Sequence, residues 1–161
     1  MTIDSKISTR IRRPKKLVTG DRDWDNVEII ANEISTWSIE TIIIHGAARG
    51  ADRIASLIAE QLGMEQRPYP YLRQFGRDGG PVRNRQMVHE EHHPDDEIEE
   101  IVAFHDRILN SLGTSDMLLV GRAHGIACRL LTSQGEVPIP WTELELMRKK
   151  RSKRASNCKL E

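Results

Sequence analysis

Residues 41–63 have the sequence TIIIHGAARGADRIASLIAEQLG. The β-branched run at 41–46 shows no polar alternation, as expected of a strand that is buried on both faces of a parallel sheet. A glycine-rich turn follows, and residues 52–62 are predicted to form a helix that ends at Gly63, because glycine is a common C-terminal cap. A buried strand, a tight turn and a helix in this order predict one βα unit of a parallel α/β sheet.

The same alternation of short apolar runs and helical periodicity continues on both sides of this unit. We expect further strands at residues 17–20, 66–71, 101–104 and 126–131, and further helices at 24–37, 81–93 and 114–124. Prolines break the run at 66–71, which places that strand near a sheet edge. The sequence thus predicts a single doubly wound, Rossmann-like α/β domain over residues 16–140, with a mostly parallel sheet of about five strands and flanking helices.

The composition is that of one globular domain. The chain has 161 residues, 38% of them hydrophobic, and no apolar run approaches the ~18 residues that span a bilayer. Residues 1–16 are polar and basic and lack the apolar stretch of a secretory signal. The two cysteines, Cys128 and Cys158, form neither a CxxC pair nor a disulfide framework. These features predict a soluble, cytoplasmic protein with no membrane partner, in which Cys128 is a small buried hydrophobe.

The formal net charge of zero conceals two basic ends around an acidic body. Residues 1–16 carry six lysines or arginines against one acid, and residues 148–161 carry seven against one. Between residues 17 and 142 lie eleven arginines, no lysine and twenty acidic residues. We treat 1–15 and 141–161 as basic tails, either solvated and disordered or able to contact nucleic acid. The arginines of the body suit phosphate or carboxylate ligands.

Polar and glycine-rich loops follow three of the predicted strands, at the edge where open α/β sheets bind ligands. These loops are residues 19–24, 45–52 and 111–116. Glycine lets the backbone approach a ligand closely, and the amides at the start of each helix favour an anion. One such loop is the ordinary connection of any βα unit, but three in one sheet predict a pocket.

A fourth loop, residues 73–80, leads into a helix that Pro81 is predicted to open. Arg83 and Arg85 then fall in its first turn, where a cation opposes the helix dipole. This break of a local rule indicates an anion-binding role. The alternative is an ion pair between arginine and a nearby acid of the body.

Several motifs of known chemistry are absent or incomplete. The sequence has no GxGxxG dinucleotide fingerprint, no GxxxxGK[ST] phosphate loop and no GxSxG nucleophile elbow, which excludes a standard NAD dehydrogenase and a P-loop NTPase. His89 and His93 match the HExxH zinc pattern, in which both histidines lie on one helical face. Pro94 follows at once and no third ligand is evident, which favours a solvated helix end. We therefore predict neither a metal nor a cofactor.

Taken in order, the loops resemble those of the YspA-like branch of the SLOG superfamily, which also includes the LOG phosphoribohydrolases and the DprA/Smf proteins. The matching stretches are VTGDRDW at 18–24, HGAARGAD at 45–52, GPVRNRQM at 80–87, AF at 103–104 and GTSDM at 113–117. The resemblance spans residues 17–131. It implies a Rossmann-like sheet, a pocket for nucleotides or nucleotide-derived ligands, and a homo-oligomer.

The resemblance also implies which residues hold the ligand. The set is Gly20, Asp21, Arg22, Trp24, Gly46, Arg49, Gly50, Asp52, Gly80, Arg83, Asn84, Gly113 and Thr114. Backbone amides near Gly113 and Thr114, together with Arg83, would hold a 5′-phosphate. Arg49 or Asp52 would hold ribose hydroxyls.

Two positions depart from the related patterns. Asp21 stands where the branch more often has serine, so a negative charge lies beside the expected phosphate site. The LOG enzymes carry a GGxGTxxE motif with a catalytic glutamate, whereas here Met117 occupies that position and the glycine doublet is missing. Asp116 lies one residue earlier, and with Arg83 it is our candidate catalytic group for cleaving an N-glycosidic bond. The alternative for Asp116 is a first-turn carboxylate that only favours the helix dipole.

The leading function is therefore binding of a nucleotide or ribose-phosphate ligand, as a sensor or sequestering module. The alternatives are LOG-like hydrolysis of nucleoside monophosphates or NAD-like compounds, and DNA binding of the DprA/Smf type. The acidic body argues against an extended nucleic-acid surface, so DNA contact is expected only from the basic tails. Trp24 and Trp37 are interpreted as core residues near the ends of the first helix rather than as stacking platforms for bases.

Overall fold

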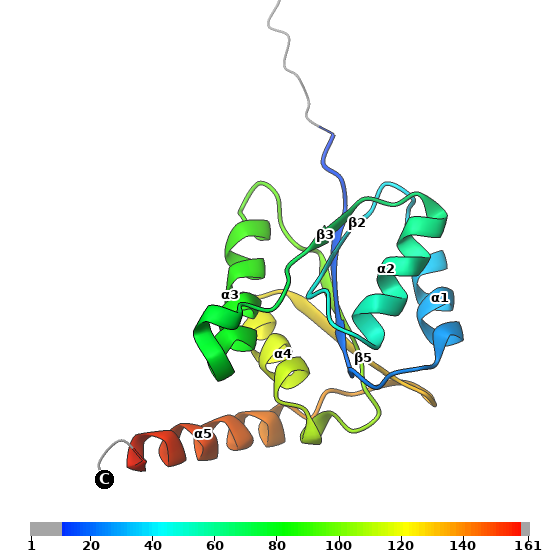
Figure 1. Ribbon diagram of the computed structural model, residues 1–161. Coiled ribbons are helices and arrows are strands. Elements are labelled where there is room, and N and C mark those ends of the chain that lie inside the picture. Colours follow the sequence, from blue (N-terminus) through cyan, green and yellow to red (C-terminus); the bar gives the residue numbers. More distant parts are fainter. Residues whose placement is uncertain (1–10, 159–161) are drawn as a thin grey trace, which may run out of the picture.

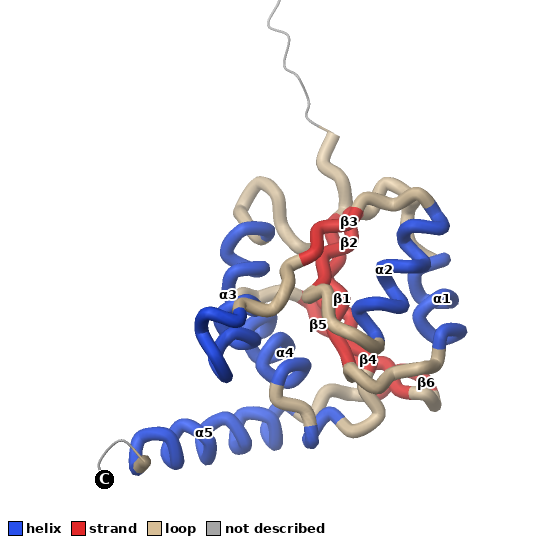
Figure 2. The backbone as a smooth tube through the Cα atoms, in the orientation of Figure 1, coloured by secondary structure: helices blue, strands red, loops and turns tan. Residues whose placement is uncertain are grey.

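The computed structural model describes residues 11–158, which form an α/β fold of three layers (Figure 1). The strands are β1 (Lys15–Gly20), β2 (Ile42–His45), β3 (Gln66–Pro68), β4 (Glu100–Phe104), β5 (Ala127–Thr132) and β6 (Gly135–Val137). The helices are α1 (Val27–Ser35), α2 (Ala51–Leu62), α3 (Gly79–Glu91), α4 (Gly113–Ala123) and α5 (Trp141–Asn157), with 3₁₀ helices at Arg73–Asp78 and Ile108–Asn110. Figure 2 shows α1 and α2 on one face of the sheet and α3 and α4 on the other. No helix in this range is long and apolar enough to cross a membrane.

All the strands belong to one sheet of order β3-β2-β1-β4-β5-β6, in which β1 to β5 are parallel and β6 is antiparallel to β5. The chain moves outward from β1 through β2 to β3 and then returns to the other side of β1 at β4. This reversal between β1 and β4 is a topological switch point, and ligands of such sheets bind beyond the carboxyl ends of the strands there. The predicted doubly wound sheet, with β3 at its edge, is confirmed.

Neighbouring residues of the central strands point into two separate cores, one on each face of the sheet. The core beneath α3 and α4 contains Leu17, Ile44, Ile101, Met87 and Met117, and Cys128 packs against it. The core beneath α1 and α2 contains Val18, Ile43, Val102, Phe104 and Trp24. Each buried aliphatic side chain contributes about 1.5–3 kcal/mol, so both helical layers stabilise the sheet. Burial also raises the pKa of the Cys128 thiol to about 11, as expected of a packing residue rather than a nucleophile.

The structure corrects three local expectations. The antiparallel strand β6 follows a hairpin at Gly135, where φ is 114°, and brings the sheet to six strands instead of about five. Residues 73–78 form a 3₁₀ helix that runs directly into α3, rather than a loop. Because α3 begins at Gly79, Arg83 and Arg85 lie beyond its first turn. The 3₁₀ segment is interrupted at Gly76, where φ is 54°, and its second part leads into α3.

Residues 141–157 form helix α5, so the expectation of a disordered C-terminal end is wrong for this segment. Tertiary contacts anchor its start: Leu144 is buried in the core beneath α4, and the Arg122 guanidinium lies over the Trp141 ring at 4.6 Å from its centroid. Beyond this anchor α5 projects past the body of the protein (Figure 1). The sequence of this segment is strongly polar, and its helix is attached to the body of the protein by contacts near its first residue.

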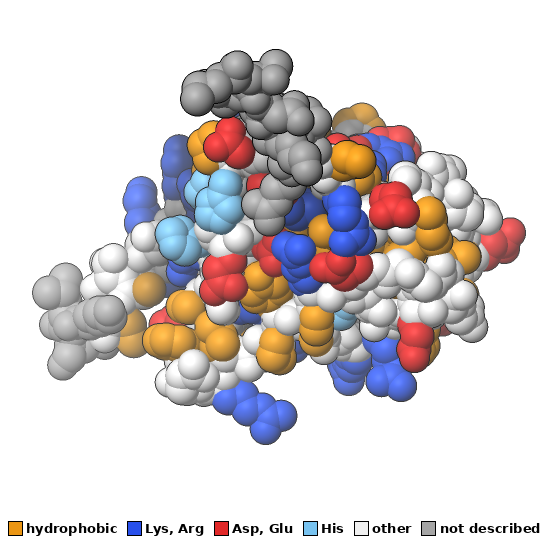
Figure 3. Space-filling model, turned by 90° about the horizontal axis from the view of Figure 1, so that it is seen from above, with side chains coloured by type: hydrophobic (Ala, Val, Ile, Leu, Met, Phe, Trp, Pro, Cys, Tyr) orange, Lys and Arg blue, Asp and Glu red, His pale blue; other side chains and the backbone are white. Residues whose placement is uncertain are grey.

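Ion pairs close the amino-terminal edge of the sheet. Lys15, which we had placed in the basic N-terminal tail, begins β1 and is buried. Its Nζ donates to the Glu91 carbonyl at 2.6 Å and lies 2.8 Å from Asp96 Oδ2. Glu91 also accepts hydrogen bonds from Arg67 Nη1 at 2.6 Å and from the Tyr69 hydroxyl at 2.7 Å. Figure 3 views the molecule from this end, where basic and acidic side chains lie next to one another. Residues 1–10 of the predicted N-terminal tail lie outside the described residues.

We expect Gly50→Ala to destabilise the fold far more than Gly63→Ala. Both glycines have positive φ, 74° and 69°, but a Cβ at Gly50 would overlap the Asp21 carbonyl, whereas nothing lies within 4 Å of one at Gly63. Left-handed backbone costs an L-residue about 1 kcal/mol, which is the loss expected for Gly63→Ala. The overlap with backbone atoms brings the expected loss for Gly50→Ala to about 3 kcal/mol or more. Urea denaturation measures both, and equal losses would show that residue 50 is not closely packed.

Candidate functional site

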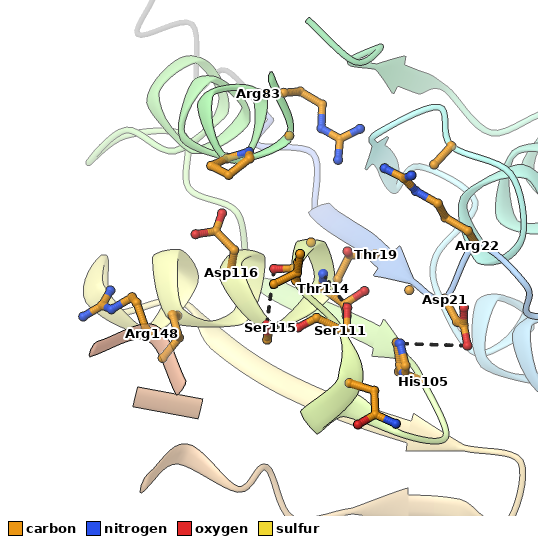
Figure 4. Close-up of a pocket in the computed structure, with 18 of the residues that line it drawn as sticks. Thr19, Asp21, Arg22, Arg83, His105, Ser111, Thr114, Ser115, Asp116 and Arg148 are labelled. Carbon is orange, nitrogen blue, oxygen red and sulfur yellow. Dashed lines mark hydrogen bonds and ion pairs between the residues drawn. The ribbon is translucent and has the colours of Figure 1, made fainter. Parts of the chain in front are cut away.

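A cavity of about 940 Å³ opens beyond the carboxyl ends of β1 and β4 (Figure 4). Its walls are the β1–α1 and β2–α2 loops, the beginning of α3, the β4–α4 loop with the beginning of α4, and one face of α5. The cavity therefore lies at the switch point of the sheet, where the sequence predicts a pocket.

Backbone hydrogen bonds to Asp21 hold two strand ends and the start of α2 together at the cavity. The Asp21 amide donates to the Phe104 carbonyl at 2.9 Å, and the Asp21 carbonyl accepts from the Ala51 amide at 3.0 Å. These bonds link β1 to β4 and to the start of α2. Glycine is required at this junction, because a Cβ at Gly20 would lie 2.5 Å from both the Phe104 carbonyl oxygen and the Ala51 Cβ.

Asp52 fixes the shape of the β2–α2 loop. Its Oδ2 accepts hydrogen bonds from the amides of Gly46 at 2.9 Å and Ala48 at 3.3 Å. Between them Ala47 has a φ of 51°, which is uncommon for a residue with a Cβ and is found at functional sites. Burial raises the pKa of Asp52 to about 6, although the loop amides and Arg83 favour its ionised form. Asp52 thus stabilises the conformation of the β2–α2 loop, and its side chain also lines the cavity.

Arg83 reaches from α3 to this loop and is only 9% exposed. Its Nη1 donates to the Gly46 carbonyl at 2.8 Å, its Nη2 to Asn84 Oδ1 at 3.4 Å, and its buried Nε has no hydrogen-bond partner in the described chain. Burial lowers the pKa of Arg83, and the nearby Arg22 lowers it further against the effect of Asp52. The sequence left open a direct ion pair between arginine and an acid. In the described chain Arg83 forms no such pair, and its guanidinium instead donates to the Gly46 carbonyl.

The amino end of α4 lines the cavity. A side chain from α3, Asn84, positions the carboxylate of Asp116 in the first turn of α4. Asn84 Nδ2 donates to Asp116 Oδ2 at 2.8 Å and to the Gly113 carbonyl at 3.3 Å. The Thr114 amide donates a hydrogen bond to Ser111 Oγ at 3.0 Å. Helix starts leave their first amides without intrahelical acceptors, so the amides of Gly113 and Ser115 are the ones left to meet an anion.

A histidine that the sequence patterns do not reveal faces Asp21. His105 follows β4 directly, and its Nδ1 accepts a hydrogen bond from the Arg107 amide at 3.0 Å. The neutral ring therefore carries its proton on Nε2, which lies 3.8 Å from Asp21 Oδ2 (Figure 4). Burial lowers the pKa of His105, and the carboxylates of Asp21 and Asp106 oppose that shift. The expected negative charge beside the phosphate site thus faces a polar N–H group.

The structure brings most of the expected ligand-binding residues to the cavity wall. Those that line it are Gly20, Asp21, Arg22, Arg49, Asp52, Gly80, Arg83, Gly113, Thr114 and Asp116. Four others lie behind the wall: Trp24 packs on Phe104 in the core, Gly46 and Gly50 make room for close contacts, and Asn84 holds Asp116.

Other residues at the wall were not predicted individually. Thr19 and His105 end or follow strands β1 and β4, so their position at the carboxyl ends could have identified them. Arg148 and Arg151 belong to α5, and no local signal connects that segment with the pocket.

The histidine-rich end of α3 lies outside the cavity. The helix ends at Glu91, so His93 lies beyond it, and its Nε2 contacts the Glu90 carbonyl at 3.0 Å. His89 and His93 therefore do not share a helical face, as the zinc pattern requires. Among residues 11–158 no group of three or more His, Cys, Asp or Glu side chains has an arrangement that could hold a metal ion.

We expect the stability of the protein to depend on the ionisation of Asp52. Its folded-state pKa of about 6 exceeds the value of about 3.9 in an unfolded chain. Protonated Asp52 therefore stabilises the fold below about pH 4, and this contribution is lost as the pH rises through about 6. Asp52→Asn keeps an oxygen acceptor for both loop amides and removes the titration.

Urea denaturation at pH 5 and pH 7.5 measures this dependence. Between these pH values the natural chain should lose about 1 kcal/mol of unfolding free energy relative to Asp52→Asn. A difference between the two chains that is independent of pH would show that Asp52 titrates at its ordinary value.

Comparison with known proteins agrees with the fold and with the sequence motifs. Residues 14–72 match the model of the YspA, cpYpsA-related SLOG family. A search of curated proteins finds no significant match. Among solved structures, the chain is similar to DNA processing protein A (DprA) from Streptococcus pneumoniae, with a TM-score of 0.59 and 14% sequence identity.

This likeness covers 85% of the present chain and 56% of the DprA chain. The chain thus spans little more than half of DprA, and at this level of identity the match shows a shared fold. The family match covers β1 to β3, including the two loops tied together at Asp21. The resemblance seen in the motifs is confirmed over residues 14–72, which are similar to the YspA, cpYpsA-related SLOG family.

Proposed function

We propose that the cavity binds a nucleotide or another phosphorylated ribose compound. The convergence of Arg22 and Arg83 is the observation that carries this proposal. Figure 4 shows the two side chains approaching each other across the space beyond β1. Asp52 lies near both, but its Oδ2 is engaged by the amides of its own loop. An anion between the two guanidinium groups would relieve their repulsion, and arginine suits phosphate because it offers two parallel donors.

The rest of the cavity supports a phosphorylated sugar rather than a simple anion. The amides of Gly113 and Ser115 at the start of α4 add donors for a phosphate. The Thr19 and Thr114 hydroxyls lie between these groups (Figure 4). A volume of about 940 Å³ falls at the upper end of the range for small-molecule sites. A ligand with a ribose and a base would use that space, with Tyr71 available at the wall as a stacking surface.

Thermal melting against 5′-nucleotides, ADP-ribose and ribose 5-phosphate tests the proposal. A ligand of the native state stabilises it by about 2.7 kcal/mol at a hundredfold excess over Kd, so at least one compound should raise Tm by several degrees. Arg22→Ala removes an exposed side chain and should raise Kd about tenfold or more, because a charge-assisted hydrogen bond contributes about 1.5–3 kcal/mol.

Arg53→Ala is the matched control. Arg53 is an exposed arginine on α2 that does not line the cavity, so its removal should leave Kd unchanged. Arg83→Lys, which keeps the charge but loses the fork of donors, should also weaken binding. Binding to Arg22→Ala as tight as to the natural chain would contradict the proposal, as would the absence of any shift across the panel.

Hydrolysis of an N-glycosidic bond is a second candidate function, and the position of Asp116 favours it. Asn84 fixes the Asp116 carboxylate at the cavity, and cleavage at an anomeric carbon requires a carboxylate near it. In this reaction the bond from C1′ to the base breaks, water supplies the hydroxyl to C1′, and its proton goes to the base.

We expect Asp116→Asn to slow release of free base about hundredfold or more while retaining the Asn84 contact through its oxygen. Chromatography of the released base, with thermal melting as a check on binding, measures the effect. Unchanged turnover in Asp116→Asn would remove Asp116 from the reaction, and no release of base by the natural chain would leave binding as the function.

A further inference from the structure

One face of α5 turns toward the cavity. The lining residues from this helix are Leu144, Met147, Arg148, Arg151, Ser152 and Ala155. Their spacing of three and four residues is that of a single helical face. Leu144 anchors this face in the core, and the residues after it lie along the projecting part of the helix (Figure 1).

Among residues 11–158, neither arginine of this face, Arg148 or Arg151, forms an ion pair with a carboxylate. The ion pair that α5 makes within the described chain joins Glu145 to Arg122, not to either of these arginines. Other basic residues of the helix, such as Lys150 and Arg154, do not line the cavity. Arg148 and Arg151 therefore differ from their basic neighbours in facing the site.

These arginines lie apart from the cationic pair near β1. In Figure 4 Arg148 and Arg22 lie on opposite sides of the view, with Thr114 and Asp116 between them. The cavity thus has two cationic ends separated by the start of α4. A single phosphate placed between Arg22 and Arg83 leaves the α5 end without an anion.

We infer that Arg148 and Arg151 form a second anion subsite, and that the ligand is a nucleotide with two separate phosphate groups. This inference rests on the proposed nucleotide binding and adds the class of nucleotide. The inner phosphate lies at Arg22, Arg83 and the start of α4. The outer phosphate, carried on the other side of the ribose, meets the guanidinium groups of α5. Binding of the outer group holds α5 against the ligand, which places this helix as one wall of the site.

The test compares nucleoside 5′-monophosphates with the corresponding 3′,5′-bisphosphates by isothermal titration at one ionic strength, for each of the four common bases. Two charge-assisted contacts should make the bisphosphate bind about tenfold or more tightly than the monophosphate. In Arg148→Ala/Arg151→Ala this ratio should fall to about one. Lys150→Ala/Arg154→Ala removes the same charge from the same helix and should keep the ratio of the natural chain.

The outcomes separate this inference from the proposed function. Monophosphate binding without a gain for the bisphosphate would overturn the second subsite and leave the proposed function standing. No binding of either compound would overturn both. Equal loss of the ratio in the two double variants would mean that α5 acts through its overall charge, as a surface for nucleic acid would, and would also overturn the subsite.

Discussion

The site depends on a close approach of backbone atoms at the carboxyl ends of β1 and β4 and at the start of α2. The Asp21 amide and carbonyl bond to Phe104 and Ala51, and this contact leaves no room for a Cβ at Gly20 or Gly50. Because the loops are tied to one another by main-chain atoms, their side chains are free to face the cavity. The same contact sets where α2 begins and therefore where Asp52 meets its loop amides.

The two ends of the sheet use charge in different ways. At the amino-terminal edge Lys15 and Glu91 are buried and each has several partners, so the charges there are balanced. At the carboxyl edge Arg83 is also buried, but its acceptors among residues 11–158 are a carbonyl and an amide oxygen. Burying a charge without a counter-charge lowers stability. Such a cost is characteristic of functional sites, which hold groups ready for a ligand at the expense of the free protein.

Several arginines meet at the cavity, although the body of the chain is acidic overall. The body is acidic, and arginines at its strand ends and on α5 create a local cationic site within it. The acidic body argues against an extended polyanion such as duplex DNA as the ligand and is consistent with the small anion that we propose. His105 adds a neutral N–H group opposite Asp21, which would reduce the effect of that carboxylate on the phosphate of the proposed ligand.

The sequence by itself determined the parallel sheet, its helices and the position of the three strand-end loops, because periodicity and turn residues act within a few positions of one another. It did not determine α5 as a cavity wall, the Asn84–Asp116 contact, the role of His105, or the buried Lys15. Each of these joins segments far apart in the chain, as in the 76-residue separation of Lys15 and Glu91. Local sequence patterns indicate which residues prefer burial. Which distant polar groups become neighbours depends on how the strands and helices pack in the folded protein.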